Sequence, residues 1–188
     1  MLMLEQRIAQ HFYESADLQS QSAATLSKPI ALAAHMLLGC FTAGGKVMLY
    51  GHESSAPLAS LGASLLAGRL ERDRPPLAGV SLNALGDSAL AVEQLRALGT
   101  PGDVLMLITT ADRAPLLAAL MRCAGEKEIG VIALTGAKSH DIDAGLTDTD
   151  VRIAVAHERR ARLFETHALV LHALADALDV QLLGEQET

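Results

Sequence analysis

The sequence predicts an α/β fold: a five-stranded parallel sheet between two layers of helices, which makes a three-layer α/β/α sandwich. Short apolar runs alternate along the chain with longer segments of helical periodicity, an order typical of strands joined by helical crossovers. The run at 46–50, Lys-Val-Met-Leu-Tyr, shows no polar alternation, so we expect a strand that is buried on both faces. A length of 188 residues suits a single domain with a full core.

Composition excludes several classes of protein. The formal net charge is −7, and the Lys and Arg residues are scattered among acidic ones. Without a basic stripe, we expect no direct binding of nucleic acid and no binding to an anionic membrane. Cys40 and Cys123 lie in apolar helical patterns, which favours buried free thiols. The first twelve residues do not resemble a signal peptide, and no apolar run is expected to span a bilayer, so we expect a cytoplasmic protein.

Two helices are expected before the first strand, in residues 1–44, ahead of an α/β core at 45–180. Apolar residues share one helical face over 4–18, and the polar Ser-Gln-Ser-Ala-Ala-Thr stretch then ends the first helix. The second helix begins near Pro29, which suits a first turn, and stops at two consecutive glycines. The core elements then follow in order: strands at 46–50, 78–82, 103–109, 130–135 and 151–155, and helices after residue 55, at 87–98, at 114–125 and at 160–178.

The turn after the first strand is the first candidate ligand site. Gly51-His-Glu-Ser-Ser55 lies where open α/β sheets bind ligands, at the carboxyl end of a strand. Ser54 and Ser55 would present hydroxyl and backbone N–H groups to a phosphate at the start of the next helix. The alternative is that Ser55 only caps that helix. Dinucleotide, Walker, Cys-x-x-Cys and nucleophile-elbow motifs are absent, so we expect no cofactor.

Six segments of the chain carry a resemblance to a known family: AGGKVMLYG (43–51), the Ser-Ser pair of GHESSA (51–56), GRLERDRPPL (68–77), GDVLMLITT (102–110), IGVIALTG (129–136) and DVRIAVAHERRARLFETHALVLHALADAL (150–178). Together they resemble the sugar isomerase (SIS) domain, and within it the phosphoheptose isomerase group. The resemblance implies one flavodoxin-like SIS domain over 1–188, a phosphorylated sugar as ligand and a homotetramer. It also implies a set of ligand-binding residues: Ser54, Ser55, Thr109, Thr110 and Arg69.

The first turn departs from the family's pattern. Members usually carry a CGNGGS-like turn, and here Glu53 replaces a glycine. Its carboxylate would repel a phosphate dianion and so weaken binding. After the third strand the two threonines are kept, but Asp112 follows them and adds a second acid, which Arg113 partly offsets.

The catalytic positions depart further. In the isomerases the helix after the first turn carries a His and a Glu four residues apart, as metal ligand and base. Here those positions are Leu61 and Leu65, so no metal site is expected. The last helix keeps Glu165 and His167 of the family's Gln-Glu-x-His pattern, although a lone His in an apolar helix is often structural. Residues 81–102 are also shorter than in the isomerases, which removes part of the pocket wall.

These departures favour a non-catalytic SIS domain that binds phosphosugars or regulates a partner. Such a module would resemble the DnaA initiator-associating protein of the same group, with the replication initiator as its protein partner. The nearly all-apolar last helix supports association into a homo-oligomer, a tetramer by resemblance. The alternative is a divergent phosphoheptose isomerase that uses His167 and Glu165. Conversion of sedoheptulose 7-phosphate would separate the two functions.

Overall fold

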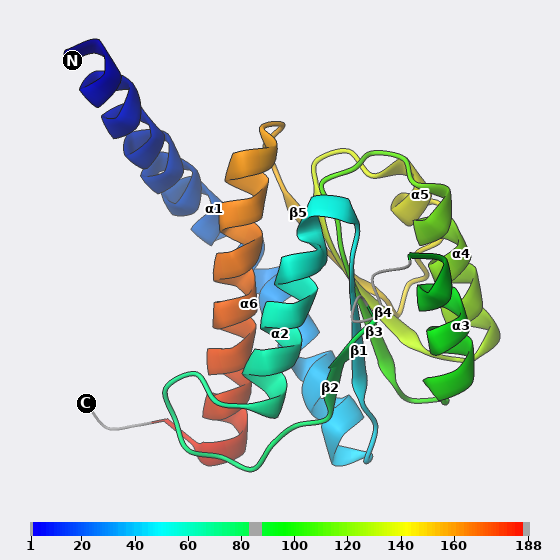
Figure 1. The fold of residues 1–188 in the computed structure, drawn as a ribbon. Coiled ribbons are helices and arrows are strands. Elements are labelled where there is room, and N and C mark those ends of the chain that lie inside the picture. Colours follow the sequence, from blue (N-terminus) through cyan, green and yellow to red (C-terminus); the bar gives the residue numbers. More distant parts are fainter. Residues whose placement is uncertain (1, 83–87, 186–188) are drawn as a thin grey trace.

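The computed structural model describes residues 2–82 and 88–185, and it contains the predicted five-stranded parallel sheet (Figure 1). The strand order is β2-β1-β3-β4-β5, with every neighbouring pair parallel. The strands are β1 (Val47–Gly51), β2 (Gly79–Ser81), β3 (Val104–Ile108), β4 (Gly130–Gly136) and β5 (Val151–Val155). The order reverses at β1, which places the switch point of the sheet between β1 and β3.

Helices cover both faces of the sheet, as the sequence predicts. They are α1 (Leu2–Thr42), α2 (Ala56–Ala67), α3 (Ser88–Leu98), α4 (Pro115–Glu126), α5 (His140–Asp143) and α6 (Arg160–Leu183), and a 3-10 turn, η1 (Glu53–Ser55), precedes α2. Helices α1, α2 and α6 pack on one face, and α3, α4 and α5 pack on the other. The expected helix at 87–98 begins at Ser88 in the described chain, since residue 87 lies outside it.

The central strands are buried on both faces, as expected from their apolar runs. Along β1, Val47 and Leu49 join the core beneath α1, α2 and α6, whereas Met48 and Tyr50 join the core beneath α3 and α4. Side chains alternate between the two faces of the sheet, but helices cover both faces. Both sets of side chains are therefore apolar, and the sequence shows no alternation of polar and apolar residues. Both cysteines are buried free thiols, as predicted.

The N-terminal region differs from the prediction, because it forms one helix of 41 residues instead of two. Pro29 lies inside α1 and has no N–H to donate to the carbonyl four residues earlier, which costs about 3 kcal/mol in a helix interior. Buried residues on both sides of the proline, among them Leu26 and Ala33, anchor the two halves to the same core. Tertiary packing therefore overrides the local stop signal.

Helix α1 bears on the expectation that no apolar run spans a bilayer. Among the described residues it is the one helix long and apolar enough to cross a bilayer by length and composition. Of the 18-residue stretch of α1 with the highest mean hydropathy, 28% is buried inside the protein. One such helix is weak evidence, because the core helix of a soluble protein passes the same test.

Candidate functional site

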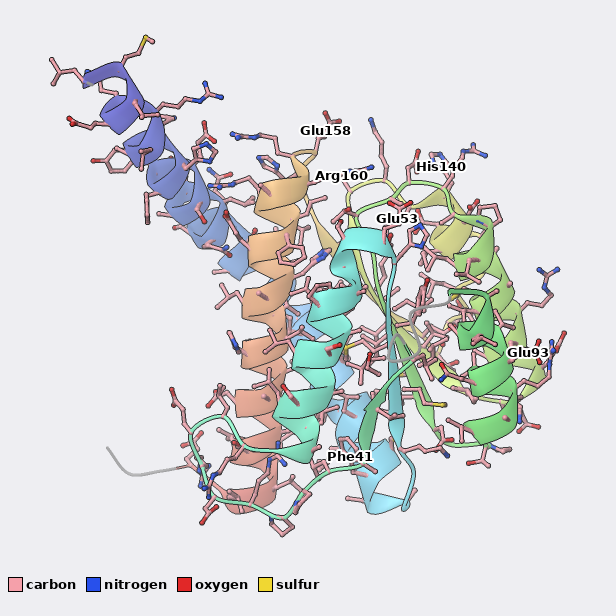
Figure 2. The ribbon with its side chains drawn as sticks, viewed as in Figure 1. Phe41, Glu53, Glu93, His140, Glu158 and Arg160 are labelled. Carbon is pink, nitrogen blue, oxygen red and sulfur yellow. The ribbon has the colours of Figure 1, made fainter. Side chains whose placement is uncertain are left out.

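A cavity of about 260 Å³ lies at the carboxyl end of the sheet. Its lining comes from the last residue of β4, the segments that follow β3, β4 and β5, and one residue of α6: Thr110, Asp112, Gly136, Ala137, Lys138, His157, Glu158 and Leu163. Figure 2 places Glu53, His140 and Glu158 at this one end of the molecule. Open α/β sheets bind ligands at this edge, so the cavity is the candidate functional site.

The cavity brings together an ammonium, a carboxylate and an imidazole from two loops. Lys138 Nζ lies 3.2 Å from Glu158 Oε1, and both side chains are largely exposed. His157 Nδ1 accepts a hydrogen bond of 2.9 Å from the backbone N–H of Arg159. The neutral ring therefore carries its proton on Nε2, which can donate to a ligand oxygen.

The loop after β4 is held in place by Arg152 of β5. The guanidinium donates to the backbone oxygens of Ala137 at 3.0 Å and of Gly136 at 3.3 Å. It also lies 3.0 Å from Asp143 of α5. These contacts connect β5, the loop and α5, so the backbone beside Lys138 is positioned by charge-assisted hydrogen bonds.

A pair of side chains joins the loops after β3 and β4 beside this cavity. Asp112 Oδ1 lies 2.5 Å from His140 Nδ1 and also accepts the backbone N–H of His140 at 3.2 Å. Those two hydrogen bonds lower the pKa of the Asp112 carboxyl below its usual value. Sequence reasoning noted Asp112 only as an unwanted acid and assigned no role to His140; their shared position after strand ends was the available signal.

The predicted serines lie where expected, after β1, but their environments differ. Ser54 is exposed, whereas Ser55 is fully buried. Ser55 makes no side-chain hydrogen bond at the start of α2, and its hydroxyl has no partner among the described residues. The capping role considered for Ser55 is therefore not seen, and its hydroxyl is enclosed.

The other predicted ligand-binding residues do not all lie at the same end of the sheet. Thr110 lines the cavity. Thr109 is fully buried, and its hydroxyl accepts the N–H of Ala111 at 3.0 Å, so it shapes the turn. Arg69 lies beyond the C-terminal end of α2, away from the helix start, and pairs with Asp73. The structure therefore brings Thr110 into the site and leaves Arg69 outside it.

Glu165 and His167 are not brought together, because two residues apart on a helix point in different directions. Glu165 accepts a hydrogen bond of 2.7 Å from Ser15 of α1 and another of 2.7 Å from Arg162 of its own helix. His167 is fully buried, with Nε2 at 3.1 Å from the Thr135 carbonyl oxygen of β4. Burial lowers the pKa of His167 to about 4, so the ring is neutral and closed to solvent.

The α2 positions that bear His and Glu in the isomerases lie in the core. Leu65 is buried and Leu61 packs against the same cluster. Within 2–82 and 88–185, no three His, Cys, Asp or Glu side chains gather as a metal site would require. The donor set at these positions does not fit the metal that the resemblance implies, since leucine offers no lone pair. The shortened segment includes residues 83–87, which lie outside the described chain.

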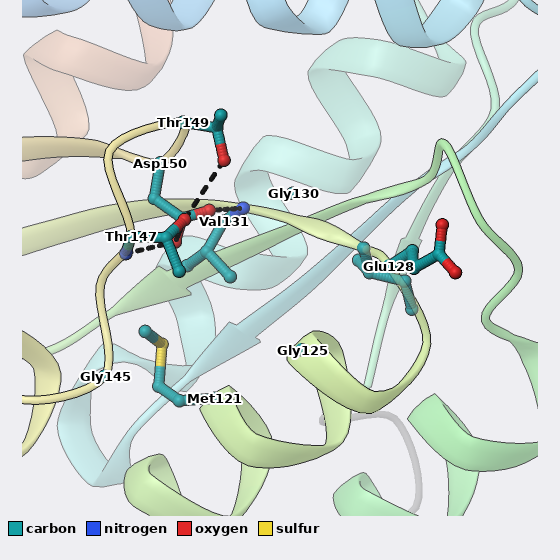
Figure 3. Close-up of a pocket in the computed structure, with 10 residues that line it drawn as sticks. Met121, Gly125, Glu128, Gly130, Val131, Gly145, Thr147, Thr149 and Asp150 are labelled. Carbon is teal, nitrogen blue, oxygen red and sulfur yellow. Dashed lines mark hydrogen bonds between the residues drawn. The ribbon is translucent and has the colours of Figure 1, made fainter.

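A second cavity, of about 300 Å³, lies at the opposite end of the sheet between α4 and the segment before β5 (Figure 3). Its carboxylate is already engaged, because Asp150 accepts the N–H of Val131 at 2.7 Å and the N–H and hydroxyl of Thr147 at 2.8 Å each. These bonds hold the start of β4 to the segment before β5. We assign this cavity a structural role.

Comparison with known proteins agrees with this architecture. The SIS domain profile matches residues 10–136. A phosphoheptose isomerase of Methylibium petroleiphilum is 50% identical over 198 residues, covering 100% of this chain and 99% of the relative. The solved phosphoheptose isomerases of Neisseria gonorrhoeae and Francisella tularensis match with TM-scores of 0.84 and 0.85, at 35% and 30% identity. They cover 94% and 95% of this chain, and 98% and 99% of their own chains are matched.

These relatives contradict the expected non-catalytic module, because proteins this similar over their full length are named for an isomerase. The expectation relied on departures from the family's pattern, namely Glu53 in the first turn, Leu61 and Leu65 on the next helix, and the shortened segment at 81–102. Similarity over the full length of the chain outweighs these local departures. The findings favour the enzyme alternative, and the chain belongs to the SIS domain family, in its phosphoheptose isomerase group.

Proposed function

We propose that the protein is a sugar-phosphate isomerase of the phosphoheptose class, which interconverts sedoheptulose 7-phosphate and the corresponding aldose phosphate. The observation that carries this proposal is the 50% identity, over the whole chain, to a relative named phosphoheptose isomerase. The candidate site is the cavity at the carboxyl end of the sheet, lined by Thr110, Lys138 and His157.

In this proposal, Lys138 binds the phosphate group. Its ammonium pairs with the exposed carboxylate of Glu158, an interaction that an incoming phosphate dianion can replace with a stronger one. The Thr110 hydroxyl and the Nε2–H of His157 then supply donors to sugar oxygens. Isomerisation further needs a base beside the reacting C–H bond and donors that stabilise the enediolate.

The test is direct turnover of sedoheptulose 7-phosphate by the unmodified protein. We expect formation of the aldose phosphate. When the reaction runs in D2O, we expect deuterium on the product carbon that was the carbonyl carbon of the ketose. Neither signal is expected with unphosphorylated sedoheptulose. Absence of both product and deuterium incorporation would show that the proposed function is wrong.

A variant pair tests the role given to the phosphate-binding lysine. Lys138→Gln should raise KM about tenfold or more, since it removes one charge-assisted contact worth roughly 1.5–3 kcal/mol. Lys28→Gln removes an exposed lysine of α1 and should leave KM unchanged. Equal KM values for the two variants would remove Lys138 from the site.

A further inference from the structure

The Asp112–His140 pair has the geometry of a carboxylate that orients an imidazole. His140 Nδ1 lies 2.5 Å from Asp112 Oδ1. The two residues are 28 positions apart, in the loop after β3 and at the start of α5, so the pair exists only in the folded chain. Both side chains remain partly open, at 60% exposure for His140 and 45% for Asp112.

This contact selects one tautomer of the imidazole. An ionised carboxylate only accepts hydrogen bonds, so the short contact requires the proton of His140 to reside on Nδ1. Nε2 is then left with a free lone pair, which is the form of histidine that acts as a base. The carboxylate also stabilises the ring once it has taken up a second proton.

The pair lies beside the candidate site. Asp112 lines the cavity together with Thr110 and Lys138, at the carboxyl end of the sheet. His157, in the same lining, presents the opposite chemistry, because its Nδ1 is occupied as an acceptor and its Nε2 carries the proton. The carboxyl end of the sheet thus carries two imidazoles of opposite chemistry. The Nε2 of His140 has a lone pair, and the Nε2 of His157 has an N–H group.

We propose that His140, held in this tautomer by Asp112, is the general base of the isomerisation, with Asp112 as its positioning residue. This inference rests on the proposed function. Nε2 takes the proton from the carbon next to the carbonyl group, the C–H electron pair forms the double bond of an enediolate, and the carbonyl oxygen becomes the anion. The imidazolium returns the proton to the former carbonyl carbon, and one hydroxyl proton moves between the two oxygens, so that atoms and electrons balance without a further reactant.

The pair also has a structural component that the test must separate. Asp112 accepts the backbone N–H of His140 at the start of α5, which connects the two loops. A neighbouring contact makes the same connection without an imidazole, because Asp141 Oδ2 accepts the N–H of Ala114 at 2.6 Å. Asp141→Asn is therefore a matched control for loosening these loops.

The experiment compares kcat and KM for sedoheptulose 7-phosphate. His140→Gln can still donate to Asp112 but cannot act as a base, and kcat should fall about a hundredfold or more with KM within about threefold. Asp112→Asn should lower kcat about tenfold or more with KM within about threefold, since the ring loses the carboxylate that fixes its tautomer. Asp141→Asn should keep kcat within about threefold.

A second variant keeps the test decisive if glutamine disturbs the loops. His140→Ala should regain part of its turnover when free imidazole is added, because the base can be supplied from solution. Near-normal kcat in His140→Gln, equal losses in His140→Gln and Asp141→Asn, or no rescue by imidazole would overturn the proposal while the unmodified enzyme still turns over. No turnover by the unmodified protein would instead overturn the proposed function and, with it, this role for His140.

Discussion

His167 is a titratable residue held where it cannot easily take up a proton. The ring is fully buried, its Nε2 lies 3.1 Å from the Thr135 carbonyl, and its Nδ1 has no partner among the described residues. Burial lowers the pKa to about 4 from an ordinary 6.5. Between pH 6.5 and about pH 4, His167 therefore binds a proton in the unfolded chain but not in the folded chain.

The contribution of His167 to stability should accordingly fall as the pH drops from 6.5 to 4, and this contribution should level off below that value. The contribution of this one residue is roughly 3 kcal/mol across that window. Urea unfolding at a series of pH values measures it. His167→Gln keeps a donor for the Thr135 carbonyl but does not titrate, so it should flatten the slope. His35→Gln, at an exposed site on α1, should not, and equal slopes in all three proteins would contradict the assignment.

Glu53 combines an unfavourable backbone with an unfavourable charge for binding phosphate. Its φ of 48° lies in the left-handed region, and its side chain is 65% exposed just ahead of α2. Burial raises the pKa of Tyr50 at the end of β1, and the negative charge of Glu53 raises this pKa further. A glycine here would remove both the strain and the carboxylate.

Glu53→Gly should therefore bind sugar phosphate about fivefold more tightly, seen as a larger rise in melting temperature at millimolar ligand. Glu128 provides the matched control, because its φ of 56° is similar but it lines the second cavity, at the opposite end of the sheet. Glu128→Gly should relieve the same strain without changing the response to ligand. Identical responses in the two glycine variants would show that Glu53 does not act on the site.

At the scale of elements, the loop between α2 and β2 is secured by a buried ion pair. Arg74 Nε lies 2.6 Å from Asp179 Oδ1 of α6, with side-chain exposures of 1% and 2%. The same guanidinium donates to the carbonyls of Leu65 and Leu66 at 2.7 and 2.8 Å, and so satisfies the last turn of α2. One arginine thus joins a loop, the end of α2 and the end of α6.

Breaking this pair should cost far more than breaking an exposed one. Asp179→Asn leaves a buried guanidinium without its counter-charge and should lower the free energy of unfolding by about 3–5 kcal/mol. Asp73→Asn removes the partner of Arg69 in an exposed pair and should change that free energy by less than about 1 kcal/mol. Denaturant unfolding of both variants provides the measurement, and similar losses would contradict the difference in burial.

At the scale of the whole molecule, the first part of α1 projects from the body as an arm (Figure 1). Its large exposed apolar side chains are Leu2, Met3, Leu4, Ile8, Phe12 and Tyr13, each between 51% and 83% exposed. Helix α6, one of the grounds for the expected assembly, buries six apolar residues within the protomer and leaves Leu169, Leu182 and Leu183 exposed. Among the described residues, the arm carries the larger group of exposed apolar side chains.

We propose that this arm packs against a second copy of the chain. Light scattering at micromolar concentration should then give the mass of an oligomer, and the double substitution Phe12→Ser with Tyr13→Ser should lower it without unfolding the protomer. Leu98→Ser, at a half-exposed site on α3, serves as the control and should leave the mass unchanged. A monomeric mass for the unmodified protein would contradict the proposal. The tetramer, the replication initiator as partner and the cytoplasmic location stay predictions.

The sequence by itself determined the five strands in their order along the chain, the parallel sheet and the burial of both its faces. These properties depend on hydrophobic periodicity within short windows, and the runs in β1, β3 and β4 carry that signal strongly. It also placed Thr110 correctly at a strand end, because the carboxyl ends of parallel strands share one edge. The function expected from it was wrong, since local departures from the family's pattern were given more weight than similarity along the whole chain.

Only the tertiary structure decided which side chains meet. Asp112 with His140, and Arg74 with Asp179, are separated by 28 and 105 residues, and no local pattern encodes such distances. The enclosure of Ser55 and His167, and the displacement of Arg69 from the site, likewise depend on how helices pack on the sheet. Packing also kept α1 continuous through Pro29, because burial on both sides of the proline outweighs the lost hydrogen bond.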